Sequence, residues 1–156
     1  MTTIAWDGKT LAADSQAQQA DVICSTSEVK IYQPKPGERW SIYGETVFAF
    51  GQSGDCGADV EIQKILSGNL TYESQFVPSF SFSALAVVSE NRAYIICKDK
   101  GEEKAAISLQ TEPYAVGSGG IIARVAMHCG KSAVYAVKTA IEMDIYSGGD
   151  VHIFTI

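Results

Sequence analysis

Thr2-Thr-Ile-Ala-Trp6, Asp7-Gly8 and Thr10-Leu-Ala-Ala-Asp14 make up the stretch that says most about the fold of this chain. Two short apolar runs joined by Asp-Gly are typical of a β-hairpin with a tight turn. The stretch directly follows Met1, and an initiator methionine is readily removed when the next side chain is small. We therefore expect a first hairpin whose leading residue, Thr2, becomes the N-terminus of the mature chain.

A threonine at the N-terminus carries a nucleophile and a base in one residue. Its hydroxyl can attack a carbonyl while its own α-amine takes the proton. The amine has an ordinary pKa of about 8, against about 10.4 for a lysine, so the amine is the better base near neutral pH. The β-branch also restricts χ1 and so aims the hydroxyl in advance. Many chains begin Met-Thr without such a role, so the rest of the sequence has to decide.

The remaining pattern predicts strands, a helix, strands, two helices and a last strand. Ala58, Ile62, Ile65 and Leu66 fall on one helical face that ends at Gly68. Helices are also expected over 121–129 and 132–143. Strands are expected over 28–32, 40–43, 46–50, 82–88, 92–97, 114–116 and 151–156, with Gly51 ending the third of these. This order predicts an α+β domain of layered, mostly antiparallel sheets. Since the chain shows no internal repeat or linker, we expect a single domain over 1–156.

Composition excludes several classes of protein. Hydrophobic residues make up 46% and charged residues 19% of the chain, as in an ordinary globular domain. The net charge of -6 argues against nucleic acid as the main partner. No apolar run approaches the ~18 to 20 residues that cross a bilayer, and no secretory signal is visible. We expect a cytoplasmic protein without a membrane segment or cofactor.

The metal-binding residue types are dispersed along the chain. His128 and His152 are too few and too far apart to predict a metal site. The cysteines have neither C-x-x-C nor zinc spacing, so reduced and mostly buried thiols are expected. They are Cys24, Cys56, Cys97 and Cys129.

An N-terminal threonine needs charged support. A lysine that stays charged would lower the pKa of the amine and stabilise negative charge on the hydroxyl. That lysine must itself be held by a carboxylate, and Lys30 and Asp14 are the natural pair, on neighbouring strands of one sheet. The reaction also needs an oxyanion donor. The backbone N–H of Gly51, at the expected end of a strand, is a candidate.

Six blocks of the sequence, in order from residue 2 to the last strand, resemble the proteasome β-subunit family. That family includes the bacterial HslV-type peptidases and belongs to the N-terminal nucleophile hydrolases. Each block is weak alone, but the six in order are specific, and they span essentially the whole chain. They are Thr2-Thr3-Ile4, Leu11-Ala-Ala-Asp14-Ser15, Lys30-Ile31, Phe50-Gly51, Val116-Gly-Ser118-Gly119 and Asp144-Ile-Tyr-Ser147-Gly-Gly149.

The resemblance implies a four-layer αββα sandwich, two mostly antiparallel sheets between helices, and a threonine-type endopeptidase. It implies stacked six- or seven-membered rings, unfolded protein or peptide substrates and a possible unfoldase ATPase partner. Thr2 is similar to the family's nucleophile, Asp14 and Lys30 to its activating pair, and Gly51 to the oxyanion-hole residue. Two further sets of residues follow from the resemblance. Ser118, Asp144 and Ser147 resemble the network around the N-terminal amine, and Ala17, Glu28, Ala49 and Ser53 sit where the family builds its primary specificity pocket.

The chain also departs from the family. It is short, its segment between Ser118 and Asp144 is trimmed, and the region from Pro34 to Trp40 is lengthened. A compact bacterial or phage-like member would fit. Two alternatives stay open, namely an inactive ring or scaffold subunit with the same fold and an N-terminal nucleophile acylase that acts on a small amide.

Overall fold

A computed structural model of the protein describes residues 2–156, and these residues form strands, three helices and their connections. The first eight strands precede the first helix. They are β1 (Ile4–Trp6), β2 (Thr10–Ala13), β3 (Ala17–Gln19), β4 (Val22–Ser25), β5 (Ile31–Tyr32), β6 (Trp40–Ile42), β7 (Glu45–Val47) and β8 (Ala49–Gly54). The remaining elements are α1 (Ala58–Ser67), β9 (Phe82–Ser89), β10 (Arg92–Lys98), β11 (Ala106–Gln110), β12 (Tyr114–Val116), α2 (Gly120–His128), α3 (Ala133–Met143) and β13 (His152–Thr155).

Two larger sheets organise the molecule. One has the strand order β12-β1-β2-β13 and the other β11-β10-β9-β8-β5, with antiparallel pairing throughout. Two small hairpins, β3-β4 and β6-β7, project from them. The predicted α+β class with antiparallel sheets is confirmed.

Alternating side chains show how the sheets pack. Along β9, one set of residues packs with α1, and the intervening Leu85 and Val87 face the other sheet. Ile4 and Trp6 of β1 meet Leu85 and Val87 from the opposite side. This period of two is what a strand buried on both faces requires. The two sheets therefore share an apolar interior.

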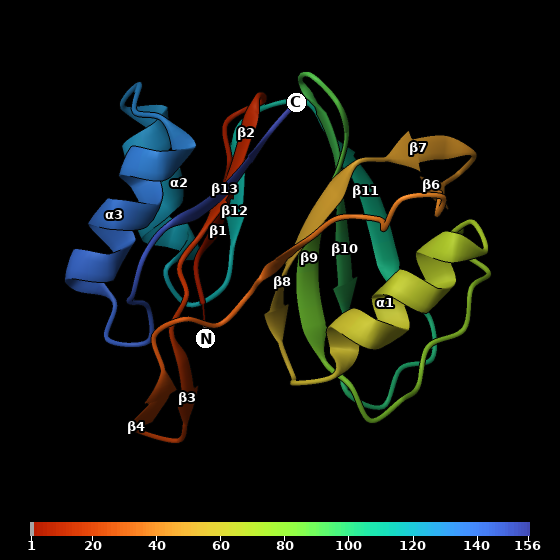
Figure 1. The fold of residues 1–156 in the computed structure, drawn as a ribbon, viewed down its shortest axis with the longest axis horizontal. Coiled ribbons are helices and arrows are strands. Elements are labelled where there is room, and N and C mark those ends of the chain that lie inside the picture. Colours follow the sequence, from red (N-terminus) through yellow and green to blue (C-terminus); the bar gives the residue numbers. More distant parts are fainter. Residues whose placement is uncertain (1) are drawn as a thin grey trace.

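Helices cover the outer face of each sheet (Figure 1). Ala58, Ile62 and Leu66 of α1 are buried against the five-stranded sheet. On the other side, α2 and α3 pack on Ala5 and Ala12 of the four-stranded sheet. The start of β1 lies between the two halves, at one end of the shared interior. That end is where side chains from both sheets can meet.

The three helices lie within about a residue of their predicted ranges, but two strand predictions are wrong. The run 46–50 is not one strand, because the chain breaks at Phe48: β7 pairs with β6, while β8 pairs with β5 and β9. Gly51 lies in the middle of β8 rather than at its end. The predicted strand 28–32 is reduced to β5, because the backbone N–H of Glu28 donates instead to the carbonyl of Ser15 at 2.8 Å.

Other differences concern exposure. The predicted burial of the thiols is wrong, since Cys24, Cys56 and Cys129 are exposed and Cys97 is half-buried.

The hairpin β3-β4 and strand β11 were not predicted, because their polar and mixed sequences carry little periodic signal. Within residues 2–156, the three helices are too short or too polar to cross a membrane.

Candidate active site

Thr2, Lys30 and Asp14 meet between the two sheets. The Lys30 ammonium Nζ donates to Thr2 Oγ1 at 2.5 Å and to Asp14 Oδ1 at 2.9 Å. All three side chains are buried, and Asp14 is fully so. Thr2 precedes β1 and Asp14 follows β2, whereas Lys30 precedes β5 of the other sheet. The prediction that Lys30 and Asp14 share one sheet is therefore wrong, and their contact joins the two sheets.

The Asp14 carboxylate is held by more than the lysine. Its Oδ1 accepts the N–H of Thr3 at 3.0 Å, and its Oδ2 accepts those of Gly148 at 3.0 Å and Gln16 at 3.3 Å. A buried charge is tolerated only where it is paired and its remaining lone pairs are satisfied. Asp14 meets both conditions and can thus fix the position of Lys30.

Burial lowers the pKa of Lys30 below its ordinary value of 10.5, against the attraction and hydrogen bond of Asp14 and weaker attraction from Glu28 and Asp144. Desolvation is the larger influence because the ammonium loses its water shell. Asp14 favours the charged ammonium, and this ammonium lies against Thr2 Oγ1.

A second network surrounds the backbone nitrogen of Thr2. This nitrogen donates to Ser118 Oγ at 3.1 Å, and Ser118 in turn donates to Asp144 Oδ2 at 2.7 Å. Ser147 donates to the same Oδ2 at 2.7 Å and shares a 2.7 Å hydrogen bond with Thr3 Oγ1. Two loops, at 117–119 and 144–147, thus converge on the nitrogen that becomes the α-amine if Met1 is removed.

Hydrogen bonds keep Asp144 ionised. Partial burial raises the pKa of Asp144, but the hydroxyls of Ser118 and Ser147 and the N–H of Tyr146 together hold it below its ordinary value of 3.8. An ionised Asp144 can orient both serines as donors. Ser118 can then accept from the nitrogen of Thr2.

The glycines of the Gly-Ser-Gly block permit this close packing. Gly117 has φ +98°, and a β-carbon there would clash with the carbonyl oxygen of Thr2. A β-carbon on Gly119 would clash with Thr3 Oγ1. Thr3 is a site residue that was not predicted, and these two glycines are the signal that could have pointed to it.

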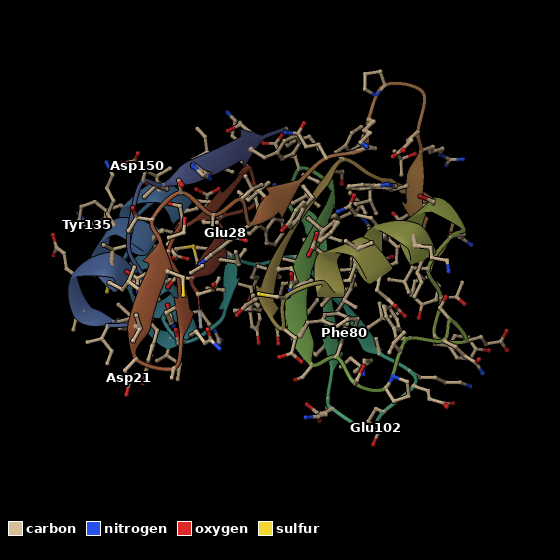
Figure 2. All side chains as sticks on the ribbon, turned by 60° about the horizontal axis from the view of Figure 1, so that its bottom comes forward. Asp21, Glu28, Phe80, Glu102, Tyr135 and Asp150 are labelled. Carbon is tan, nitrogen blue, oxygen red and sulfur yellow. The ribbon has the colours of Figure 1, made fainter. Side chains whose placement is uncertain are left out.

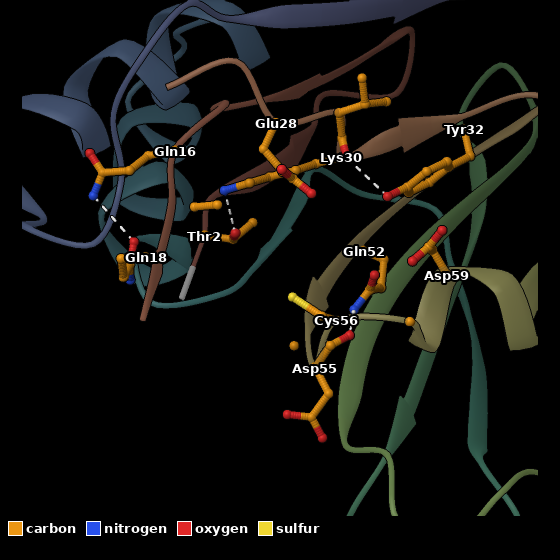
Figure 3. Close-up of a pocket in the computed structure, with 14 residues that line it drawn as sticks. Thr2, Gln16, Gln18, Glu28, Lys30, Tyr32, Gln52, Asp55, Cys56 and Asp59 are labelled. Carbon is orange, nitrogen blue, oxygen red and sulfur yellow. Dashed lines mark hydrogen bonds between the residues drawn. The ribbon is translucent and has the colours of Figure 1, made fainter. Parts of the chain in front are cut away.

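A cavity of about 160 Å³ opens beside Thr2 (Figure 3). Of the residues predicted for a specificity pocket, Ala17 and Glu28 line it. Figure 2 shows Glu28 between the side of the molecule that carries α3 and the side that carries α1. Thr2 and Lys30 border the cavity, and the residues from the end of β8 to the start of α1 form much of its wall. Its lining residues that were not predicted are Gln16, Gln18, Val29, Tyr32, Gln52, Gly54, Asp55, Cys56, Gly57 and Asp59.

Ala49, Gly51 and Ser53 lie on the other face of β8, away from the lining of this cavity. Ala49 is buried between the sheets, and a β-carbon on Gly51 would lie 2.6 Å from Ile4 Cγ2. Ser53 Oγ lies near Gly117. A shift of one residue along a strand exchanges its two faces. The strand end was expected at Gly51 but lies at Gly54, and Ala49 and Ser53, assigned to the pocket from the resemblance, do not line this cavity.

The Gly51 N–H is also poorly aimed for an oxyanion. The N–H of Gln52 donates to the carbonyl of Lys30 at 3.1 Å, toward β5. Successive N–H groups of a strand point in opposite directions, so that of Gly51 points toward β9, where Gly51 is paired with Leu85. Within residues 2–156, His, Cys, Asp and Glu form no group of three able to hold a metal ion.

No protein-family model matches the chain, and no curated protein does. Solved structures do match. They include Thiobacillus denitrificans BPH, solved alone and in complex with epoxomicin. The two are 17% and 18% identical to this chain, each with a TM-score of 0.65, and the matches cover 99% of this chain and 96% and 97% of theirs. At this identity the likeness establishes a shared fold over nearly the full length of both chains.

Proposed function

We propose that this protein is a threonine-type endopeptidase of the N-terminal nucleophile hydrolase class, similar to proteasome β-subunits and HslV-type peptidases. The observation that carries the proposal is the contact of Lys30 Nζ with Thr2 Oγ1 at 2.5 Å, next to a Thr2 nitrogen held by Ser118. The arrangement of helices outside two facing sheets supports the four-layer αββα fold of that class.

The chemistry starts with removal of Met1, which turns the Thr2 nitrogen into an amine. The amine takes the proton of Thr2 Oγ1, and the oxygen attacks the amide carbon of the substrate. Lys30 stabilises the developing alkoxide. The tetrahedral intermediate collapses as the amine's proton passes to the leaving nitrogen, which leaves an ester on Thr2. Water then gives a proton to the same amine and attacks the ester, which releases the acid and restores the Thr2 hydroxyl.

The backbone N–H of Gly54 replaces that of Gly51 as the proposed oxyanion donor. By the alternation along β8, it points to the same side as the Gln52 N–H, but beyond the contact with Lys30. Gly54 borders the cavity together with Thr2. A donor there would face the carbonyl oxygen of a bound substrate, and such donors contribute about 10²- to 10³-fold to the rate.

The neighbour's ligand supports the same chemistry. Epoxomicin is a threonine protease inhibitor, and it is bound in the complex of the Thiobacillus protein. The shared fold makes an equivalent reaction at Thr2 a direct test of the proposal.

Exposed apolar side chains support the ring that the resemblance implies. Ile121 and Val125 lie one turn apart on α2 and are 77% and 59% exposed, and Ile145 is 78% exposed. Apolar side chains that share an exposed helix face, as Ile121 and Val125 do, can form an interaction site. We propose that they contact further copies of the chain in six- or seven-membered, stacked rings, with an unfoldase ATPase as a possible partner. Native mass spectrometry tests this by the number of subunits.

The function is tested by the intact mass of the purified protein before and after treatment with epoxomicin. We expect loss of one methionine and a stoichiometric adduct that disappears in Thr2→Ala. An intact Met1 without an adduct would contradict the proposal and favour the inactive scaffold subunit. An adduct together with cleavage of small amides but not of peptides would favour the acylase.

A further inference from the structure

The cavity beside Thr2 carries more negative charge than its own residues neutralise. Glu28, Asp55 and Asp59 line it. Among its described lining residues, the single basic side chain is that of Lys30. Lys30 already pairs with Asp14. The only other salt bridge found within residues 2–156 joins Arg92 to Glu45.

Two of these carboxylates, those of Glu28 and Asp59, accept few hydrogen bonds from the rest of the fold. Asp55 Oδ2 accepts the N–H of Ser81 at 2.9 Å and so has a structural role. The described part of the chain offers no hydrogen-bond donor to the Glu28 carboxylate, and Asp59 has only a long contact of 3.5 Å from Gln63. Figure 3 shows Glu28 and Asp59 on opposite sides of Tyr32.

The negative charges of Glu28 and Asp59 both affect the Tyr32 hydroxyl. Burial raises the pKa of Tyr32, and the negative charges of Asp59 and Glu28 raise it further. The Tyr32 hydroxyl donates to the carbonyl of Val29 at 2.9 Å, so toward the cavity its oxygen can only accept. Glu28, from the segment before β5, and Asp59, from the first turn of α1, thus both line the cavity around Tyr32.

An amide oxygen adds an acceptor that is independent of the charges. Gln52 is 8% exposed and lines the cavity, and its Nε2 contacts the carbonyl of Asp55 at 3.4 Å. Among residues 2–156 no donor reaches its Oε1. This oxygen is not one of the fully buried atoms without a partner, so it is accessible and can accept a hydrogen bond from a bound group. The cavity therefore presents several acceptors and three carboxylates, and its wall also holds one buried side-chain donor without a partner, Gln18 Nε2.

The position of the cavity relative to Thr2 Oγ1 indicates which part of a substrate would bind in it. Thr2 borders the cavity, and its Oγ1 is the atom proposed to attack the carbonyl. The side chain of the residue that contributes this carbonyl is attached one atom away, so it is placed at the mouth of the cavity. Ala17 on the wall is small and leaves the entrance open.

We infer that this cavity selects a cationic side chain, that of arginine or lysine, on the residue whose carbonyl Thr2 attacks, with Glu28, Asp59 and Gln52 Oε1 as its partners. The inference rests on the proposed peptidase function and deepens it. A guanidinium carries five N–H donors and an ammonium three, so either cation can donate to more than one acceptor.

The test compares four fluorogenic peptides that differ only at this residue, which is Arg, Lys, Leu or Glu. We expect kcat/KM for Arg and Lys to exceed that for Leu by about tenfold or more, since 1.4 kcal/mol corresponds to tenfold, and Glu to be the poorest substrate. The ratio of Arg to Leu should fall about three- to tenfold in Glu28→Gln and in Asp59→Asn. Glu90→Gln makes the same charge change in the exposed turn after β9 and should leave the ratio as it is. A preference for Leu, or an unaltered ratio in both cavity variants, would overturn the inference.

A binding measurement keeps this result separate from a failure of the peptidase proposal. In Thr2→Ala, argininamide should shift the NMR signals of the Gln52 side chain, and leucinamide at equal concentration should not. Such selective binding without any epoxomicin adduct on the unaltered protein would retain the cationic pocket and reject the peptidase. An epoxomicin adduct formed without selective binding of argininamide, and without preferred cleavage after Arg or Lys, would support the peptidase proposal and reject the cationic pocket.

Discussion

The two sides of the candidate site differ in how completely they are bonded. On the side of the four-stranded sheet, Asp14 accepts four hydrogen bonds, and Asp144 is held by two hydroxyls and a backbone N–H. On the side of β8 and α1, Glu28 and Gln52 Oε1 face the cavity without donors from residues 2–156. On the first side the acceptors already have their hydrogen bonds without a substrate. On the second side acceptors are available to a substrate.

This difference follows from what each side has to do. A charge that activates a nucleophile must stay in one place, and preorganised groups do so without reorganising during the reaction. A wall that selects a side chain must leave its polar groups available until the substrate arrives.

The largest effect is expected from Thr2→Ala. Removal of the nucleophile should lower peptide cleavage at least about 1,000-fold, because the remaining groups can then only bind and polarise the substrate. Cleavage assays on folded protein measure this loss. Thr139→Ala on the outer part of α3 removes the same hydroxyl elsewhere and should keep the activity. Equal activity of Thr2→Ala and the unaltered protein would exclude Thr2 as the nucleophile.

Removal of Asp14 should destabilise the protein more than removal of Lys30. Asp14→Ala leaves the Lys30 ammonium buried and deprives three N–H groups of their acceptor, so we expect a loss of about 3 to 5 kcal/mol in the free energy of unfolding. Lys30→Met leaves Asp14 with its three backbone donors and should cost less. Urea unfolding of both variants measures the difference. A larger loss in Lys30→Met would mean that the backbone donors do not hold the carboxylate.

These two sides were also unequally predictable from the sequence. Thr2, Asp14 and Lys30 could be named because an N-terminal nucleophile needs these residue types, whereas Ser118, Asp144 and Ser147 were named from the resemblance to a family. The structure brings all six together. The walls could not be predicted as well. Gly51 was placed at the site because the end of β8 was set three residues too early, whereas Ala49 was placed there from the resemblance alone.

Sequence periodicity says little where the chain changes from strand to helix. The segment from Gln52 to Asp59 contains Gly54 and Gly57, both with positive φ, and lacks a repeating apolar pattern. Its side chains are directed by those backbone angles rather than by burial. Lys30 illustrates another limit, since its partner lies on the other sheet, and contacts between sheets leave no local signal.

The oxyanion assignment predicts a difference between two amides of β8. Formation of the epoxomicin adduct should slow hydrogen exchange of the Gly54 N–H by about two- to tenfold, because a hydrogen bond to a neutral oxygen contributes about 0.5 to 1.5 kcal/mol. The Gly51 N–H, which points toward β9, should exchange at the same rate with and without the adduct. Exchange measured by NMR distinguishes the two residues. Protection that develops at Gly51 instead would restore the assignment made from the sequence.

The smallest effect is expected from Asp144, which lies on the side of the four-stranded sheet. Its pKa is lower in the folded protein than its ordinary value of 3.8, so its contribution to stability is present above that pH and is lost as the pH falls through the lower folded value. Asp144→Asn should therefore be less stable than the unaltered protein at pH 7, by less than about 1 kcal/mol because the carboxylate is partly exposed to solvent. The gap should narrow at pH 3. Urea unfolding at the two pH values measures it, with the exposed Asp150→Asn as the matched control. A gap that widens on acidification would mean that the hydroxyls of Ser118 and Ser147 do not donate to Asp144, and the orientation of Ser118 toward the Thr2 nitrogen would need another cause.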